Sequence, residues 1–195
     1  MILEGLVTTQ SPQGELNLAP MGPVVDPEMT SVLLRPFQTS RTFRNLREHP
    51  FGVLHVTDDV LLMAQAALNL LQEPPESFPT RKIPGRVLAG CCRWMEFEVE
   101  SIDDSRERSE IRVRIVHRET LREFWGFNRA KHAVLEATIL ATRLHLIPGE
   151  EIRRTLDRLR EPVEKTAGPA ELTAFQLVWD YVRRHLTAIE ESSST

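Results

Sequence analysis

The sequence predicts an α+β protein, a β-barrel to which helices are added late in the chain. Short segments with strand periodicity and hairpin turns fill most of residues 1–127, and helical patterns dominate from residue 128 onward. A run of strands followed by helices favours a barrel with helical additions over a doubly wound sheet. The sequence contains no GxGxxG, Walker-type or GxSxG motif, so nothing in it indicates a dinucleotide-binding, P-loop or hydrolase fold.

Composition is that of a globular chain that can bury a core. The 195 residues are 41% hydrophobic and 27% charged, which fits one domain or a domain with a helical appendage. The net charge of −4 does not indicate a general affinity for nucleic acid. No signal-like leader and no apolar run of membrane-spanning length is present, so we expect a cytoplasmic protein without a membrane partner.

Two adjacent cysteines, Cys91 and Cys92, are the only ones in the chain. Neighbours on a strand point to opposite faces, so these two are poorly placed to bridge each other. No CxxC pair or Cys/His cluster is present, and we therefore expect no metal site and a reduced protein.

The first strands predict a β-hairpin followed by an irregular exit. Residues 2–9 are apolar and β-branched, residues 11–14 have turn chemistry, and residues 15–18 alternate polar with apolar. The next segment combines small side chains with two prolines, which do not suit a central strand: Ala19, Pro20, Met21, Gly22 and Pro23. Its backbone is open to a flat ligand, and a plain exit from an edge strand is the alternative.

The candidate site lies in a short helix between two strand-like runs, residues 31–34 and 52–56. Thr39 or Ser40 can cap this helix, which His49-Pro50 ends. The segment concentrates hydroxyl, amide and guanidinium groups: Thr39, Ser40, Arg41, Thr42, Arg44 and Asn45. A helix N-terminus suits a phosphate because its N–H groups are unpaired and it carries partial positive charge. The chemistry predicted here is phosphate binding, and an ordinary solvated turn is the alternative.

The remaining elements complete the expected domain plan. Asp58 and Asp59 precede a predicted helix at residues 60–71, where capping is the preferred interpretation over a carboxylate pair for acid/base chemistry. Residues 72–84 predict a proline-rich surface loop, and residues 87–99 and 110–117 predict two long strands.

Domain boundaries follow from these elements. Residues 1–127 form the expected barrel, with inserted helices near 41–48 and 60–71. Residues 128–189 form the C-terminal helices, packed on the barrel or on a second subunit, and residues 190–195 form a disordered tail.

Ordered motifs in the first third of the chain resemble those of the flavin reductase-like, FMN-binding split β-barrel superfamily. They are Val7-Thr8-Thr9, Asn17-Leu18-Ala19-Pro20, Asp26-Pro27 and Thr39-Ser40-Arg41-Thr42-Phe43-Arg44-Asn45-Leu46, the last fitting T-S-R-T-x-x-N-L. The whole chain resembles a largely archaeal branch of unknown function. The segments that carry this second resemblance are Met21-Gly22-Pro23, His55-Val56-Thr57-Asp58-Asp59 and Gly126-Phe127-Asn128-Arg129-Ala130-Lys131.

This resemblance implies a split barrel that binds FMN at a homodimer interface. The residues expected to hold the phosphate and ribityl chain are Thr39, Ser40, Arg41, Thr42 and Asn45. Those expected along the isoalloxazine edge are Ala19, Pro20, Met21 and Gly22. Arg129 and Lys131 are expected from the partner subunit, and a surface capping role is their alternative.

The resemblance also implies an FMN-dependent oxidoreductase of flavin reductase type, acting on a small molecule or a nicotinamide. The flavin would carry the redox chemistry. No catalytic residue is identified: His55, His117 and His132 are candidate proton donors, and each is alternatively structural. A non-catalytic FMN carrier or sensor is the first alternative. A dimeric scaffold that has lost flavin is the second, and the intact T-S-R-T-x-x-N-L segment argues against it.

Overall fold

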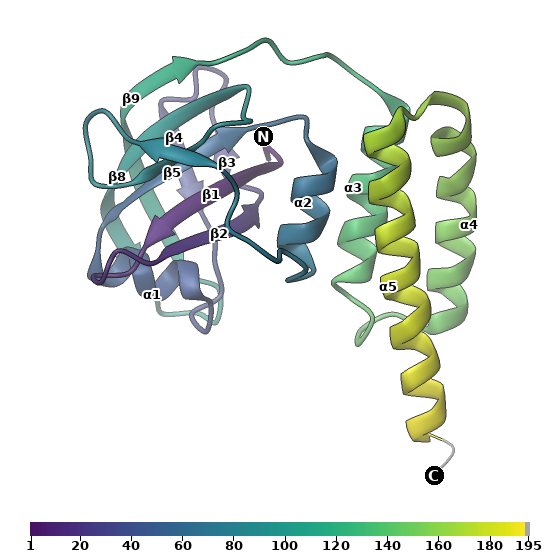
Figure 1. The fold of residues 1–195 in the computed structure, drawn as a ribbon. Helices are drawn as coiled ribbons and strands as arrows, with labels where there is room; N and C mark the ends of the chain where they lie inside the picture. The colour runs from purple at the N-terminus through teal and green to yellow at the C-terminus, as the bar shows by residue number, and fades with distance from the viewer. Residues whose placement is uncertain (194–195) are drawn as a thin grey trace. The chain divides into compact units, whose positions relative to one another are not determined.

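The computed structural model describes residues 1–193 and divides into two compact units (Figure 1). The barrel unit comprises residues 1–58 and 72–124, and the helical unit comprises residues 59–71 and those from 125 onward. The second inserted helix, which the sequence placed with the barrel, therefore belongs to the helical unit.

A seven-stranded antiparallel sheet curls into a half barrel in the first unit (Figure 1). Its spatial order is β2-β1-β5-β8-β9-β4-β3. The strands are β1 (Gly5–Gln10), β2 (Leu16–Met21), β3 (Val24–Val25), β4 (Ser31–Leu34), β5 (Phe51–Val56), β8 (Arg93–Asp103) and β9 (Glu110–Thr120). The predicted barrel with added helices is confirmed.

The β1–β2 hairpin places the predicted irregular segment on the edge of this sheet. Gln10 pairs with Leu16 across the turn, where Gly14 adopts a φ of +84° that glycine tolerates. The strand continues beyond its predicted end, and Pro20 pairs with Leu6. Proline is accommodated there because the outer side of an edge strand needs no N–H donor.

A second, two-stranded sheet lies in the connector that the sequence predicted to be a loop. It consists of β6 (Ser77–Pro79) and β7 (Arg86–Leu88). The predicted strand at residues 87–99 is therefore interrupted between β7 and β8. The hydroxyl of Thr8 donates to the carbonyl of Arg86 at 2.7 Å, so β7 is held against β1 by a contact remote in sequence.

The interior of the half barrel is apolar and closely packed. Its buried side chains include Val7, Leu34, Phe43, Leu54, Met95, Phe97 and Ile111. The backbone of Gly52 lies so close to Phe97 that a Cβ atom at position 52 would overlap the Phe97 ring. The core thus excludes any side chain at position 52.

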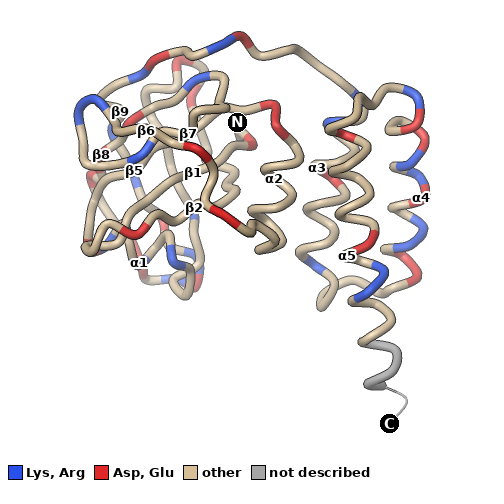
Figure 2. Tube along the Cα trace, in the orientation of Figure 1, with Lys and Arg blue, Asp and Glu red and all other residues tan. Residues whose placement is uncertain are grey.

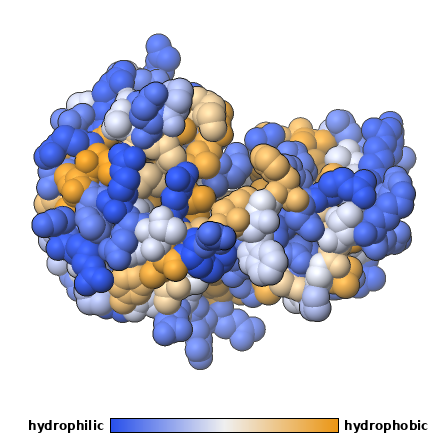
Figure 3. All heavy atoms as spheres, turned by 90° about the horizontal axis from the view of Figure 1, so that it is seen from above, coloured by the Kyte–Doolittle hydropathy of each residue, from blue (hydrophilic) through white to orange (hydrophobic). Residues whose placement is uncertain are grey.

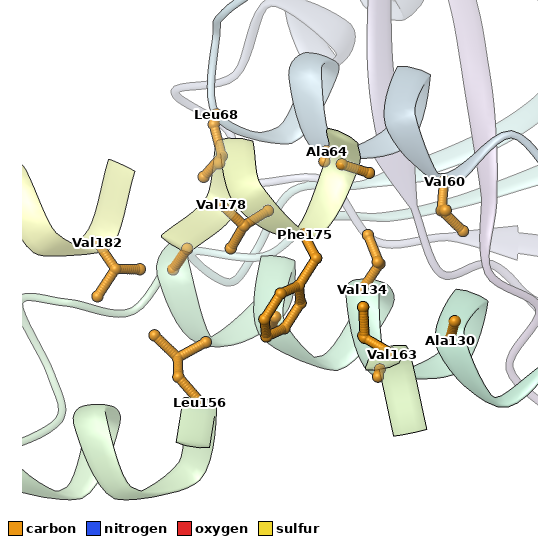
Figure 4. Close-up of a cluster of buried hydrophobic side chains, with 14 of the residues drawn as sticks. Val60, Ala64, Leu68, Ala130, Val134, Leu156, Val163, Phe175, Val178 and Val182 are labelled. Carbon is orange, nitrogen blue, oxygen red and sulfur yellow. The ribbon is translucent and has the colours of Figure 1, made fainter. Parts of the chain in front are cut away.

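The helical unit contains α2 (Val60–Ala67), α3 (Arg129–Ala141), α4 (Gly149–Thr166) and α5 (Pro169–Ser193). Val60, Ala64 and the C-cap Leu68 join one apolar cluster with residues of α3, α4 and α5, among them Val134 and Phe175 (Figure 4). Burial of this α2 face explains why the helix groups with the C-terminal helices.

The last of the C-terminal helices extends further than the sequence predicted. Helix α4 passes through Pro162 to Thr166. Helix α5 continues to Ser193, so the backbone of residues 190–193 is helical where a disordered tail was predicted, and residues 194–195 lie outside the described chain. None of the helices in the described residues is long and apolar enough to span a membrane. On the face seen in Figure 3, hydrophilic side chains alternate with small apolar areas.

Candidate functional site

The helix α1 (Arg41–Glu48) begins at the predicted cap. Ser40 has an extended backbone, with φ −73° and ψ 152°, and its Oγ accepts from the Phe43 N–H at 3.1 Å. His49 is the C-cap, so the predicted end is confirmed. The N–H groups of Arg41 and Thr42 have no acceptor among the described residues, as expected in a first helical turn. These two donors are available to an anion.

A buried hydrogen-bond cluster ties α1 to the β1–β2 hairpin. Thr9 Oγ1 accepts from Asn17 Nδ2 at 3.2 Å and from Asn45 Nδ2 at 3.0 Å. Asn17 Nδ2 also donates to Thr42 Oγ1 at 3.1 Å. Thr9, Thr42 and Asn45 are at most 5% exposed. Two of the predicted phosphate-binding side chains, Thr42 and Asn45, therefore face the protein interior and orient the helix.

The other predicted phosphate-binding residues face solvent. Thr39 is exposed, Ser40 is half-buried at the cap, and Arg41 donates to Glu15 Oε2 at 2.7 Å. The side chains of Arg41 and Glu15 are 53% and 65% exposed, so their ion pair contributes only about 0–1 kcal/mol. An anion of higher charge can therefore replace Glu15 as the partner of Arg41. Arg44 and Arg47 are exposed and add positive charge to α1. Figure 2 shows basic residues along this helix.

The predicted ring-binding segment runs along the open edge of β2. Ala19, Pro20 and Met21 are half-buried, and no strand of the described chain pairs with their outer side. Gly22 follows, and a Cβ atom there would lie 2.8 Å from the Ile2 side chain. Asn17 of β2 bonds directly to Thr42 of α1, so the N-terminus of the helix lies next to the edge strand in the barrel unit.

Arg129 and Lys131 lie in the helical unit, in the first turn of α3. Asn128 is the N-cap, and its side chain accepts from the Lys131 N–H at 3.0 Å. Lys131 Nζ lies 2.8 Å from Glu171 Oε1, with both side chains less than a fifth exposed. The hydrogen bond from Lys131 lowers the pKa of Glu171. Lys131 thus links α3 to α5, whereas Arg129 is exposed.

The three candidate histidines differ in what they can do. His55 is fully buried, and its Nε2 accepts from the Leu88 N–H at 3.1 Å. The proton must therefore be on Nδ1, which donates to the Leu6 carbonyl at 3.1 Å. Both ring nitrogens are occupied, so His55 is structural. His117 contacts Glu119 at 3.3 Å, and the exposed His132 lies edge-on to Phe127.

The structure identifies polar contacts that the sequence did not predict. Glu96 is fully buried, and its carboxylate accepts from the backbone N–H groups of Arg81 and Lys82, each at 2.7 Å. The only sequence signal was an acidic residue within an apolar strand.

The two aspartates before α2 have separate roles. Asp59 is the N-cap, accepting from Leu62 N–H at 2.9 Å, which confirms capping. Asp58 instead binds Arg122 through both carboxylate oxygens, at 2.5 and 3.2 Å. The neighbouring Cys91 and Cys92 are free and buried, and burial raises the pKa of the Cys91 thiol to about 12.

The curled antiparallel sheet of the barrel unit has the fold of a split β-barrel, to which the chain adds C-terminal helices. Residues 3–122 match the N-terminal domain of DUF447, described as a protein of unknown function, and residues 128–180 match the second DUF447 domain. The chain belongs to the DUF447 family. A search of curated proteins finds no match.

Solved structures share this fold. An FMN-bound DUF447 protein from Methanosarcina mazei is 24% identical, with a TM-score of 0.78, over 92% of this chain and 94% of that one. The flavin reductase of styrene monooxygenase from Pseudomonas putida S12 is 14% identical, with a TM-score of 0.51, over 61% and 81%. A flavin reductase complexed with NADP+ is 14% identical, with a TM-score of 0.54, over 64% and 81%.

We expect His55 to titrate near pH 4 in the folded protein, because burial lowers its pKa to about 4 from 6.5. The unfolded chain takes up this proton first as the pH falls. The stabilising contribution is therefore complete above about pH 6.5 and is lost by about pH 4, a difference of about 3 kcal/mol. An NMR titration of the imidazole Cε1 proton, assigned by its absence in His55→Gln, measures this pKa. A midpoint near 6.5 would contradict the buried, neutral assignment.

Proposed function

We propose that this protein binds FMN and acts as an oxidoreductase of flavin reductase type on a small molecule or a nicotinamide. One observation carries the proposal: the Asn17–Thr42 hydrogen bond holds the N-terminus of α1 next to β2, the edge strand of the sheet. The helix supplies anion donors, and the strand supplies unpaired backbone along its outer edge. The description of the Methanosarcina mazei relative as FMN-bound supports the choice of cofactor.

The phosphate of FMN is assigned to the start of α1. The free N–H groups of Arg41 and Thr42 and the hydroxyls of Thr39 and Ser40 are the donors, and the Arg41 guanidinium exchanges Glu15 for the phosphate. Thr42 and Asn45 act from the interior by fixing the direction of the helix. These residues fit the group because neutral donors and an exposed arginine converge where a helix begins.

The isoalloxazine ring is assigned to Ala19, Pro20, Met21 and Gly22. The outer edge of an antiparallel strand presents N–H and C=O groups in alternation, which can bind the hydrogen-bonding edge of a planar heterocycle. Pro20 can contribute only its carbonyl because proline has no N–H. Gly22 has no Cβ, which allows its backbone to lie close to the Ile2 side chain at the end of the segment.

The site is proposed to be completed in a homodimer. Phe124, Trp125 and Phe127 are 49%, 86% and 97% exposed, an unusual density of exposed aromatic residues in so short a segment. Exposed apolar groups of this kind are typical of interaction surfaces. Arg129 of the partner subunit is assigned as a further cation for FMN, and Lys131, held by Glu171, positions the start of that helix.

The chain's role in the reaction is to bind and orient. A bound flavin supplies a centre that accepts and releases hydride. Hydride transfer requires no acid/base pair from the protein, and His55 cannot serve as one because both of its ring nitrogens are bonded. The free cysteines fit a reducing, cytoplasmic environment.

A non-catalytic FMN carrier or sensor is the second candidate. It is favoured by the composition of the β2 edge, where Ala19, Pro20, Met21 and Gly22 bring no acid or base to the proposed ring.

Replacing Arg41 with alanine is expected to weaken FMN binding about tenfold to a hundredfold, because one charge-assisted contact to the phosphate is lost. The fold should be retained, since the Arg41 side chain is 53% exposed. Glu15→Gln is the matched control: it breaks the same ion pair but removes a competing charge, so FMN binding should be unchanged or stronger. Quenching of flavin fluorescence measures both affinities. Equal affinity of Arg41→Ala and wild type would refute the phosphate assignment.

Mixing FMN-loaded protein with NADH or NADPH without oxygen separates the two candidates. Rapid bleaching of the visible absorbance of the oxidised flavin is expected for a flavin reductase. Flavin that stays bound and oxidised with both nucleotides would favour the carrier or sensor.

A further inference from the structure

A cavity of about 400 Å³ lies in the barrel unit, between the turn at residues 26–31, the start of β8 and the end of β9. Its volume is in the range of small-molecule sites. None of its lining residues belongs to the surface assigned to FMN, so a ligand in this cavity would bind independently of the flavin.

The turn that forms one wall is held in an uncommon conformation. The Asp26 carboxylate accepts from the Thr30 N–H at 2.7 Å, the Thr30 hydroxyl at 2.5 Å and the Ser31 N–H at 3.0 Å. Met29 has a φ of +52°, in the left-handed region that side chains other than glycine seldom adopt. Residues in such conformations persist where the surroundings fix them, often at ligand sites.

Two arginines on the cavity wall have no carboxylate partner among the described residues. Arg93 Nη2 donates to Met29 Sδ at 3.2 Å. Arg118 donates only to backbone carbonyls, those of Glu28 at 3.4 Å and Met29 at 3.3 Å. Both side chains keep donors for a further acceptor, because a guanidinium carries five N–H groups.

The two glutamates among the lining residues differ in whether they already have a partner. Glu119 is shared between Arg81 Nε at 3.7 Å and His117 Nε2 at 3.3 Å. Glu28 is exposed and is the remaining carboxylate that opposes the two arginines. Among the described residues, the lining therefore holds two arginines and one carboxylate, Glu28, that are in no ion pair, an excess of one positive charge.

Trp94 lies between the two cavity-lining residues Arg93 and Met95, and its side chain is fixed in the interior on the opposite face of β8. The residue is 1% exposed, and its indole N–H donates to the buried Glu96 at 3.3 Å. Phe78 packs edge-on against the ring, with centroids 5.6 Å apart. Since Glu96 also accepts from the backbone N–H of Arg81, one buried carboxylate fixes the Trp94 ring and the turn after β6, and thereby the strand that carries Arg93.

We propose that this cavity is a second ligand site, which binds a small molecule through anionic oxygens, from either a phosphate or a carboxylate group. Arg93 and Arg118 would grip the anion with paired N–H donors. Because Asp26 already holds the turn at residues 26–31 in one conformation, binding costs little conformational entropy in this wall.

Isothermal titration of the full chain with inorganic pyrophosphate and, separately, with citrate tests this site and distinguishes the two sources. We expect at least one anion to bind. Arg93→Gln should weaken binding about tenfold or more through loss of one charge-assisted contact, while Glu28→Gln should strengthen it. Arg93 contacts only the Met29 sulfur, so its replacement leaves the turn's backbone contacts in place. Unchanged melting curves would verify that the variants fold.

A control locates the binding. Arg112→Gln removes the same charge from an exposed position of β9 outside the cavity, so it should not alter the affinity for the anion. Failure of both anions to bind, or binding that is lost in Arg112→Gln and retained in Arg93→Gln, would overturn the proposal.

Discussion

The hydroxyl oxygen of Thr9 is the point on which the proposed FMN surface depends. It accepts from both Asn17 and Asn45, and so connects β1, β2 and α1 through a largely buried group of hydrogen bonds. Buried polar groups are costly unless they are paired, so this cluster permits one orientation of α1 relative to the hairpin. The helix N-terminus consequently lies beside the open edge of β2. Interior hydrogen bonds, and not surface charge, therefore place the proposed anion site next to the edge of β2.

Buried polar side chains also hold the β6–β7 sheet against the main sheet. His55 accepts from Leu88 on β7, and Glu96 accepts from the turn that follows β6. Both side chains project from central strands, are fully buried and bind backbone N–H groups. Short strands with little apolar surface are thus held in place by polar contacts from the sheet. Glu96 also binds the indole N–H of Trp94, the residue next to Arg93 in β8.

Much of the barrel could be predicted from local patterns, because strand alternation, the turn before β2 and the cap at Ser40 are encoded by adjacent residues. The β6–β7 sheet could not, since its strands are short, proline-bounded and stabilised by Thr8 and His55 from distant strands. Sequence reasoning grouped Thr42 and Asn45 with Arg41 because all are polar. Which side of an eight-residue helix faces the hairpin depends on tertiary packing. The unpaired state of Arg93 and Arg118 likewise results from ladder register and has no local signature.

The central claim is that one surface, from the start of α1 along the outer edge of β2, binds FMN. Backbone amide chemical shifts of isotope-labelled protein, recorded during titration with FMN, test it most directly. We predict that the largest shifts fall on the amides of residues 19, 21 and 22 and of residues 39–42. Shifts concentrated on other parts of the barrel unit, with these residues unaffected, would contradict it.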